Sequence, residues 1–204
     1  MTGYDGLVRC GWAGTTPDYV AYHDEEWGRP VHGDDLVFER VTLEAFQSGL
    51  SWLTILRKRE NFRKAFAGFS IPAVAVFDEG DVERLLGDAG IVRNRAKIEA
   101  TVANARAALE TPGGLSALVW KYAEEPGRVP ATLADIPART AGSTALAKEL
   151  KKHGFRFVGP TTAYALMQAI GLVNDHVADC HVREAVTAQV AEAPTGLRSG
   201  ASPC

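Results

Sequence analysis

The stretch FVGPTTAYALMQAIGLVNDHV, residues 157–177, decides the fold that we expect for this chain. Pro160 is typical of the first position of a helix and Gly171 of a helix end, so we predict a helix between them. The preceding segment STALAKELKKH (143–153) predicts another helix. Residues 143–171 are therefore predicted to form two helices joined by a short hairpin.

The hairpin loop GFRFVG, residues 154–159, has the features of a phosphate-binding turn. Gly154 and Gly159 permit close approach of the backbone, and the N-terminus of the following helix presents free amides to an anion. We therefore predict that Gly154, Gly159 and Thr161 contact the phosphates of a nucleic acid without reading its sequence. The alternative is a helical hairpin that only packs, which is the commoner use of this motif.

Helix signals also dominate the rest of the chain, and alternating strand patterns are scarce, so we expect an all-α fold. The further predicted helices cover residues 17–28, 34–47 and 95–109, with one short helix at 115–122 inside a loop-rich stretch from 111 to 142. We predict one globular unit over residues 8–185. Residues 1–7 and 186–204 are predicted to be flexible termini, because the stretch after 186 has few large apolar side chains.

The composition is that of an ordinary globular protein, with 204 residues, 46% hydrophobic and 23% charged, and a net charge of −3. No run of roughly eighteen apolar residues appears, and residues 1–12 are too polar for a signal peptide, so we expect neither membrane insertion nor export. The three cysteines, Cys10, Cys180 and Cys204, are too few for a disulfide framework. We expect a cytoplasmic monomer without an obligate protein partner.

Three windows are basic although the whole chain is slightly acidic. They are RKRENFRK at 57–64, IVRNRAK at 91–97 and KELKKHGFR at 148–156. Each of them alone is usually a solvated helix face. The three together are compatible with one surface that faces the phosphates of a nucleic acid.

Four potential metal ligands lie in the first and last parts of the chain, and they are Cys10, His23, His176 and Cys180. His176 and Cys180 are four residues apart, a spacing that lets both face one ion from a helical turn. Zinc is the ion expected for such a set, and because four protein ligands leave no open position, the site would be structural. Two alternatives stay open: His181 competes with Cys180 as a ligand, and isolated Cys and His residues usually have ordinary packing or surface roles.

Aromatic side chains gather in the first quarter of the chain, and they include Trp12, Tyr19, Tyr22, Trp27 and Trp52. Such stripes are more often core than binding site. Glu44 favours a binding site over a core, because it is flanked by apolar residues on a predicted helix, where a carboxylate needs a partner. A cage of aromatic rings with one carboxylate suits a flat cationic ligand through cation–π and ionic contacts.

Several separated motifs, in the same order, resemble the 3-methyladenine DNA glycosylase I family of the helix-hairpin-helix superfamily. They are RCGW (9–12), AYHDEEWG (21–28), LEAFQSGLSW (43–52), RKREN (57–61), DAGIVRNRAKI (88–98) and LVNDHV (172–177). The resemblance covers roughly residues 8–181. It implies a helical DNA glycosylase with one structural zinc ion, held here by Cys10, His23, His176 and Cys180.

The resemblance also implies how an extruded base is bound. Glu44, the best candidate for a catalytic role, and Tyr22 would bond to the base edge, while the other pocket aromatics, Trp12, Tyr19, Trp27 and Trp52, would line or close the pocket. Leu50 is either a wedge that fills the gap left by the base or a buried core leucine. The expected substrate is double-stranded DNA that contains alkylated adenine.

Two positions depart from the superfamily pattern. Thr161 stands where members that also nick the backbone carry a Schiff-base lysine, so we expect no lyase activity. Asn174 stands at the usual catalytic aspartate, so either Asp175 takes a shifted role or that acid is absent. The expected reaction is hydrolysis of the N-glycosidic bond of 3-methyladenine, which leaves an abasic site.

Two other classes of function stay open. A zinc-stabilised module that binds DNA without catalysis would share the hairpin and the basic windows. A zinc hydrolase would use the metal directly, but a closed set of four protein ligands leaves no position for water.

Overall fold

The regular structure of the chain is helical. The computed structural model describes residues 1–124, 127 and 129–192, and in this part the only β-structure is one isolated bridge between Thr2 and Val8. The predicted all-α class is therefore confirmed for the described residues. No helix among them is long and apolar enough to cross a membrane.

The helices follow one another along the chain with short connections. They are α1 (Pro17–Glu25), α2 (Asp34–Gln47), α3 (Trp52–Ala65), α4 (Ile71–Ala75), α5 (Glu79–Gly87), α6 (Arg95–Leu109), α7 (Leu115–Trp120), α8 (Ala141–Lys152), α9 (Pro160–Ala169) and α10 (Arg183–Glu192), with 3₁₀ turns η1 (Gly11–Ala13), η2 (Ala67–Phe69) and η3 (Leu133–Asp135). The predicted helices at 34–47 and 95–109 coincide with α2 and α6. The helix predicted over 17–28 ends earlier, at Glu25.

Side-chain caps explain several of these starting points. Ser51 accepts a hydrogen bond from the Thr54 amide at the start of α3, and Asn94 accepts one from the Lys97 amide at the start of α6. Each cap satisfies an amide that has no partner within its own helix. The polar residue before each of these two helices, α3 and α6, therefore sets the position of the first turn.

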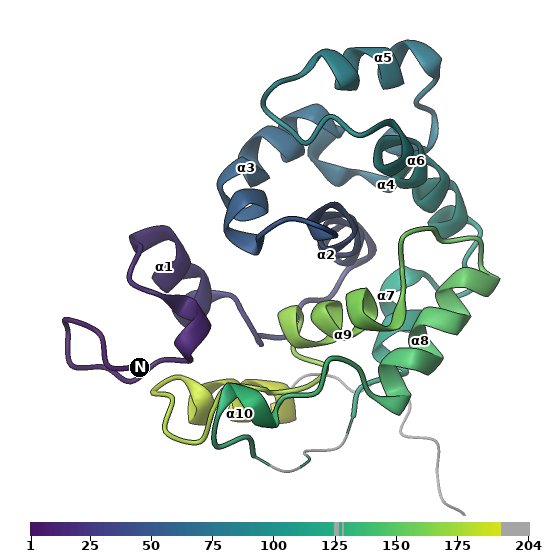
Figure 1. Cartoon of the computed structure of the whole chain (residues 1–204). Helices are drawn as coiled ribbons and strands as arrows, with labels where there is room; N and C mark the ends of the chain where they lie inside the picture. Colours follow the sequence, from purple (N-terminus) through teal and green to yellow (C-terminus); the bar gives the residue numbers. More distant parts are fainter. Residues whose placement is uncertain (125–126, 128, 193–204) are drawn as a thin grey trace, which may run out of the picture.

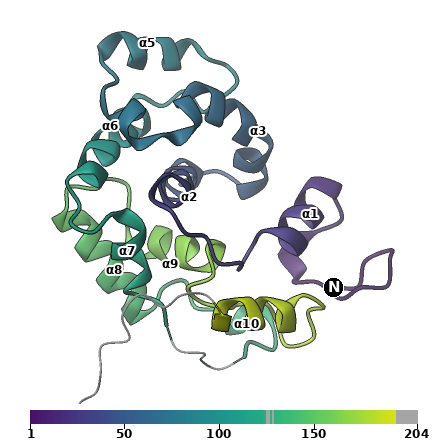
Figure 2. The ribbon, with the colours of Figure 1, turned by 180° about the vertical axis from the view of Figure 1, so that it is seen from behind.

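Helix α2 lies at the centre of the molecule and is seen nearly end-on in both views (Figures 1 and 2). It contacts α3, α4, α6, α7 and α9. Phe46 on α2 packs on Phe62 of α3 with ring centroids 4.7 Å apart, and both side chains are fully buried. Because α2 is surrounded, the residues at its C-terminal end are held in a fixed place next to α3 and α9.

The predicted hairpin is present, with α8 and α9 packed against each other. Gly154 ends α8 with a φ of +93°, a conformation that favours glycine. Asn104 of α6 fixes the loop, because its side chain donates to the Arg156 carbonyl at 3.1 Å and accepts from the Arg156 amide at 2.7 Å. A Cβ atom at Gly159 would meet no atom within 4 Å, so the space beside this residue is open.

The two ends of the described chain carry more structure than we predicted. The Met1 ammonium donates a hydrogen bond to the Arg9 carbonyl at 2.6 Å. Helix α10 extends to Glu192, and Val186 on it is fully buried beside the cluster that contains Cys10 and Cys180. One well-placed valine thus anchors a helix whose average hydrophobicity is low. Flexibility of both ends stays a prediction, and residues 193–204 lie outside the described residues.

Candidate functional site

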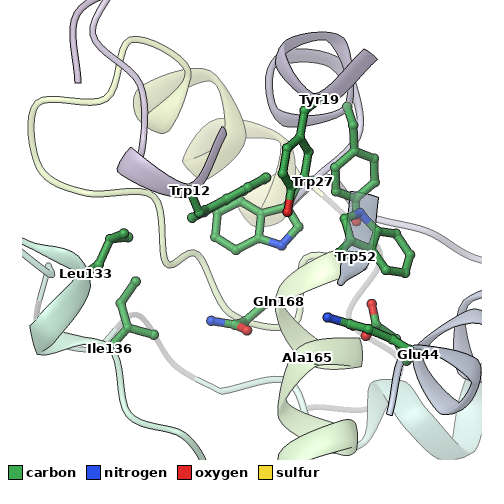
Figure 3. A pocket seen from close by; sticks show the side chains of 11 residues that line it. Trp12, Tyr19, Trp27, Glu44, Trp52, Leu133, Ile136, Ala165 and Gln168 are labelled. Atoms are coloured by element: carbon green, nitrogen blue, oxygen red, sulfur yellow. The ribbon is translucent and has the colours of Figure 1, made fainter. Parts of the chain in front are cut away.

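A cavity of about 290 Å³ lies between the N-terminal segment, α1, α2, α3 and α9 (Figure 3). Its lining consists of Trp12, Tyr19, Tyr22, Trp27, Glu44, Gln47, Trp52, Leu133, Ile136, Ala165 and Gln168. All six residues predicted for a binding pocket, namely Trp12, Tyr19, Tyr22, Trp27, Glu44 and Trp52, surround this one space. The fold brings them together, and their roles in binding stay predictions.

The aromatic side chains of the cavity support one another by edge contacts. The ring centroids of Trp12 and Trp27 lie 4.9 Å apart with planes at 71°, and those of Tyr22 and Trp52 lie 5.3 Å apart. Such tilted pairs are a favourable arrangement for aromatic rings and restrict their rotation. The aromatic side chains that line the cavity therefore support one another.

Glu44 is the acidic side chain in the cavity lining. It is 6% exposed, and its carboxylate has no hydrogen-bond partner among the residues that the structure describes. Burial raises the pKa of Glu44 to about 8, although the positive charge of Arg40 opposes part of that rise. A buried acid without a partner is a group that a ligand can satisfy.

A largely buried ion cluster stands behind the cavity. Glu26, just after α1, accepts two hydrogen bonds from Arg59 of α3 at 2.6 and 2.7 Å and one from Arg40 of α2 at 3.0 Å. The second terminal nitrogen of Arg40 is buried without a partner. The cluster ties α1 to α2 and α3, and it places positive charge near Glu44.

Five lining residues were missed by the sequence analysis. Gln47 is one turn beyond Glu44 on α2, so helical spacing could have indicated it. Ala165 and Gln168 share one face of α9. Two more, Leu133 and Ile136, belong to the stretch predicted as loop-rich. Only tertiary packing brings α9 and this stretch to the cavity, and the sequence has no spacing that relates them to α1.

The positions that replace the superfamily aspartate lie outside the cavity lining. Asn174 donates to the Arg183 carbonyl and to the Thr187 hydroxyl. Asp175 accepts hydrogen bonds from Tyr164 at 2.6 Å and from Gln168 at 2.8 Å. Asp175 therefore touches a residue of the cavity wall without forming the wall itself.

The four predicted metal ligands meet at one buried point. One ligand atom from each of Cys10, His23, His176 and Cys180 lies within 4.8 Å of the other three. The Cys180 sulfur lies 3.4 Å from Nδ1 of His176 and 3.5 Å from Nε2 of His23. His181 instead lies 3.0 Å from Asp24, so the structure groups Cys180, and not His181, with the other three residues.

The far nitrogens of the two imidazoles have fixed partners. Nδ1 of His23 donates to the Asp24 carboxylate at 2.7 Å, and Nε2 of His176 donates to the Trp27 carbonyl at 3.1 Å. The other nitrogen of His176 lies near both sulfurs, and that of His23 lies near the Cys180 sulfur and accepts a hydrogen bond from the Cys10 amide at 3.3 Å. Hydrogen bonding from Cys10, followed by His176 and His23, lowers the pKa of the Cys180 thiol. This cluster could hold a metal ion.

The residues predicted to contact DNA are exposed or have free space beside them. Leu50 is 42% exposed, so it is not a core leucine. It follows Gly49, whose φ is +81°, at the tip of the α2–α3 turn. Thr161 is exposed on the first turn of α9 and does not line the cavity. Contact of Leu50, Gly154, Gly159 and Thr161 with DNA stays a prediction.

The basic windows differ in how many of their charges are available. In the first window Arg57, Arg59 and Arg63 form ion pairs with acidic residues of α1 and α2 or the residue after α1. In the second window Arg95 pairs with Glu79, Glu83 and Glu99, and the Lys97 ammonium donates to the carbonyls of Phe46 and Ser48.

In the hairpin window, Lys148, Lys151 and Arg156 have side chains without an ionic partner in the described part of the chain. The hairpin therefore offers the most available positive charge of the three.

This fold and this cavity define a class of helical protein with an aromatic pocket that contains one buried carboxylate. The methyladenine glycosylase family model matches residues 12–184. The chain belongs to this family.

Individual relatives agree with this assignment. The chain is 49% identical over 179 residues to DNA-3-methyladenine glycosylase 1 of Escherichia coli (strain K12), which covers 85% of this chain and 96% of that protein. A crystal structure of 3-methyladenine DNA glycosylase I has 47% identity and a TM-score of 0.82, over 85% of this chain and 98% of that one. A variant of 3-methyladenine DNA glycosylase I in complex with 3-methyladenine has 34% identity and a TM-score of 0.82, over 86% and 97% of the two chains.

Proposed function

We propose that this chain is a DNA repair glycosylase that hydrolyses the N-glycosidic bond of 3-methyladenine in double-stranded DNA. The observation that carries the proposal is the aromatic cavity with the buried, unpartnered carboxylate of Glu44. Family membership supports it, since the similar proteins are named as 3-methyladenine DNA glycosylases. In this proposal the flipped base lies among Trp12, Tyr19, Tyr22, Trp27 and Trp52.

The positive charge of the alkylated ring explains the selection of the damaged base. A cationic ring gains cation–π energy from the aromatic faces and an ionic contact with Glu44, whereas neutral adenine gains much less. Glu44 is about half protonated near pH 8, and a bound cation favours its ionised form. Flipping costs a few kcal/mol of unstacking, which stacking in the cavity offsets.

The reaction needs little acid catalysis, because a cationic purine is already a good leaving group. The bond between C1′ and the base nitrogen breaks with its electron pair going to the base. Water then attacks C1′, loses a proton, and an abasic site remains. Thr161 at the position of the superfamily's Schiff-base lysine leaves no amine to attack C1′, so the enzyme is proposed to lack lyase activity.

We further propose that Cys10, His23, His176 and Cys180 hold one structural zinc ion. Zn–S bonds of about 2.3 Å and Zn–N bonds of about 2.0–2.1 Å in a tetrahedron separate sulfur and nitrogen by roughly 3.5 Å. The sulfur–nitrogen distances among these ligands are 3.4, 3.5 and 3.6 Å. Zinc held there would join the N-terminal segment to the region before α10 and have no open position for a reactant.

Contact with DNA is proposed for the hairpin and for the α2–α3 turn. The backbone at Gly154, Gly159 and Thr161 would bind phosphates, and exposed Leu50 would enter the gap left by the flipped base. Action as a cytoplasmic monomer stays a prediction.

The test of the activity is release of free base from DNA that carries 3-methyladenine. We expect release by the wild-type protein, a loss of about tenfold or more in Glu44→Gln, and no strand nicking at the resulting abasic sites. Glu110→Gln is a matched control, because Glu110 is exposed and remote from the cavity lining.

Different failures of this assay have different meanings. A wild-type protein that binds the DNA and releases no base would be a DNA-binding module without catalysis. Base release that depends on catalytic metal, with loss on mild chelation while the fold is retained, would favour a zinc hydrolase. Nicking above the level without enzyme would contradict the assignment of Thr161.

A further inference from the structure

A hydrogen-bonded chain of three residues reaches the cavity from α9. Gln168 lines the cavity, and its amide nitrogen donates to Oδ2 of Asp175 at 2.8 Å. The hydroxyl of Tyr164, one helical turn before Gln168, donates to the same oxygen at 2.6 Å. The Tyr164 side chain is buried, so it cannot easily move away and release the carboxylate.

The chain fixes which end of the Gln168 amide points into the cavity. The NH₂ end of Gln168 faces Asp175, because its amide nitrogen is the atom that donates to Oδ2, and a carboxylate oxygen is an acceptor. The carbonyl Oε1 then points away from Asp175 and has no hydrogen-bond partner among the described residues. Figure 3 shows this amide extending from α9 into the space below the tryptophans. The atom that Gln168 offers to a ligand is therefore an acceptor.

We infer that Gln168, with its amide oriented by Asp175 and Tyr164, is a specificity-determining residue that selects a base edge with N–H donors and rejects one with a carbonyl. The inference rests on the proposed function, because it assumes that a purine base enters this cavity. Its ligand class is an aminopurine with an exocyclic amine at position 6. Asp175 and Tyr164 act through Gln168 and are positioning residues.

The physical reason is the set of acceptors in the cavity. The oriented Gln168 presents an acceptor at its free atom, and Glu44 presents acceptors once a bound cationic base favours its ionised form. Adenine presents an amino group at position 6, whereas guanine presents a carbonyl oxygen there. A carbonyl opposite a fixed acceptor has no hydrogen bond and meets repulsion between lone pairs, so a correctly placed acceptor discriminates strongly. A freely rotating amide would offer its NH₂ group to guanine and lose this discrimination.

The test compares the affinities of free 3-methyladenine and free 3-methylguanine, measured by quenching of tryptophan fluorescence. In Gln168→Leu we expect Kd for 3-methyladenine to rise about tenfold, while Kd for 3-methylguanine stays the same or falls. In Asp175→Asn the Gln168 amide can rotate, because the amide introduced at position 175 would donate to Oε1, and we expect the preference for 3-methyladenine to fall about tenfold. Tyr164→Phe should reduce the preference by a smaller factor.

Controls separate this effect from damage to the fold. Gln189→Leu removes an exposed glutamine of α10 that bonds to Arg29 and does not line the cavity, and it should keep the wild-type preference. Metal content and thermal melting are measured for every variant, since Asp175 adjoins His176. If Asp175→Asn loses metal, Gln168→Leu decides the question, because Gln168 lies on α9 and has no hydrogen bond to the four cysteine and histidine side chains in the described part of the chain.

The outcomes distinguish this inference from the proposed function. If the wild type binds neither base and releases none from DNA, the proposed function fails. If the wild type binds and excises 3-methyladenine but Gln168→Leu and Tyr164→Phe keep the wild-type preference over 3-methylguanine, only the role of Gln168 is overturned. A reduced preference with normal melting and metal content supports it.

Discussion

Glu44 is a residue whose proposed role in ligand binding lowers the stability of the folded protein. Its carboxylate is buried without a partner, and its pKa in the folded protein is about 8, compared with about 4.5 for an ordinary glutamate. The folded state therefore holds a proton on Glu44 that the unfolded state has lost between these two pH values. Because the folded state binds more protons, the free energy of unfolding falls as the pH rises from about 4.5 to 8.

Glu44→Gln should remove this pH dependence. We expect the variant to be more stable than wild type at pH 8, with a gain about 2–4 kcal/mol larger there than at pH 5, because a neutral amide has no charge to bury. Urea unfolding at the two pH values measures the difference. Glu110→Gln, at an exposed position, should change stability equally at both. An equal effect of Glu44→Gln at pH 5 and pH 8 would contradict the assignment of the raised pKa.

The sequence predicted the candidate site residues whose residue type is unusual for their position or whose spacing is typical of a site. The ligand set Cys10, His23, His176 and Cys180 and the acid Glu44 belong to residue types that stand out in their surroundings. Gln168 does not stand out, because a glutamine on a helix is ordinary. Its importance depends on the hydrogen bond to Asp175 across the α9 end, which appears only in three dimensions.

At the scale of elements, the ion cluster of Glu26 is a junction between three helices. Arg40 is 13% exposed and Arg59 is 15% exposed, so both guanidinium groups are largely out of water. The single carboxylate of Glu26 forms ion pairs with both of them. The cluster therefore fixes how α1 meets α2 and α3 at the back of the cavity.

Glu26→Gln should destabilise the protein by about 2–4 kcal/mol, because it leaves two largely buried guanidinium groups without a counter-charge. Chemical denaturation measures the change. The neighbouring Glu25 is exposed and has no ionic partner in the described part of the chain, so Glu25→Gln should stay within about 0.5 kcal/mol of wild type. Similar stabilities of the two variants would show that the cluster is not a structural junction.

The hairpin is the element with the most available positive charge. Arg156→Gln should weaken binding to undamaged DNA and reduce the slope of log K against log salt by about 1, because one phosphate contact is lost. Arg57 already pairs with Asp18, so Arg57→Gln should change the slope less. Equal slopes for wild type and Arg156→Gln would place the DNA on another surface.

Element positions were predictable where caps and periodicity coincide, as in α2 and α6. Helices α3, α4 and α5 and the anchoring of α10 were not predicted. Helix α4 has five residues, too few for a period to emerge, and α10 depends on the burial of Val186 against distant partners. The three basic windows did not all provide available positive charge. The sequence shows the basic residues of a window but not the acidic residues that pair with them in the folded protein.

For the whole molecule, the cysteine and histidine cluster joins parts of the chain more than 150 residues apart. A metal ion there would therefore stabilise the wall that contains Trp12 and Trp27. It would do so without touching a ligand in the cavity, since none of the four residues is among the lining residues.

Cys10→Ser should lose one equivalent of bound zinc and lower the melting temperature, because two distant segments lose their link. The remaining folded fraction should bind 3-methyladenine with about wild-type affinity at low temperature. Cys204→Ser is the control for the loss of a cysteine and should keep zinc. Retained zinc and stability in Cys10→Ser would contradict the ligand assignment; a folded, zinc-free protein that has lost only activity would contradict the structural role.

The cavity wall has a consequence for the order of events during synthesis. Trp12, Tyr19, Tyr22 and Trp27 leave the ribosome early, whereas Ala165 and Gln168 emerge only after some 140 further residues. A chain synthesised as far as α8 lacks the part of the wall that α9 supplies, namely Ala165 and Gln168. We therefore expect that a nascent chain cannot enclose a base before α9 has been synthesised and has packed against α2.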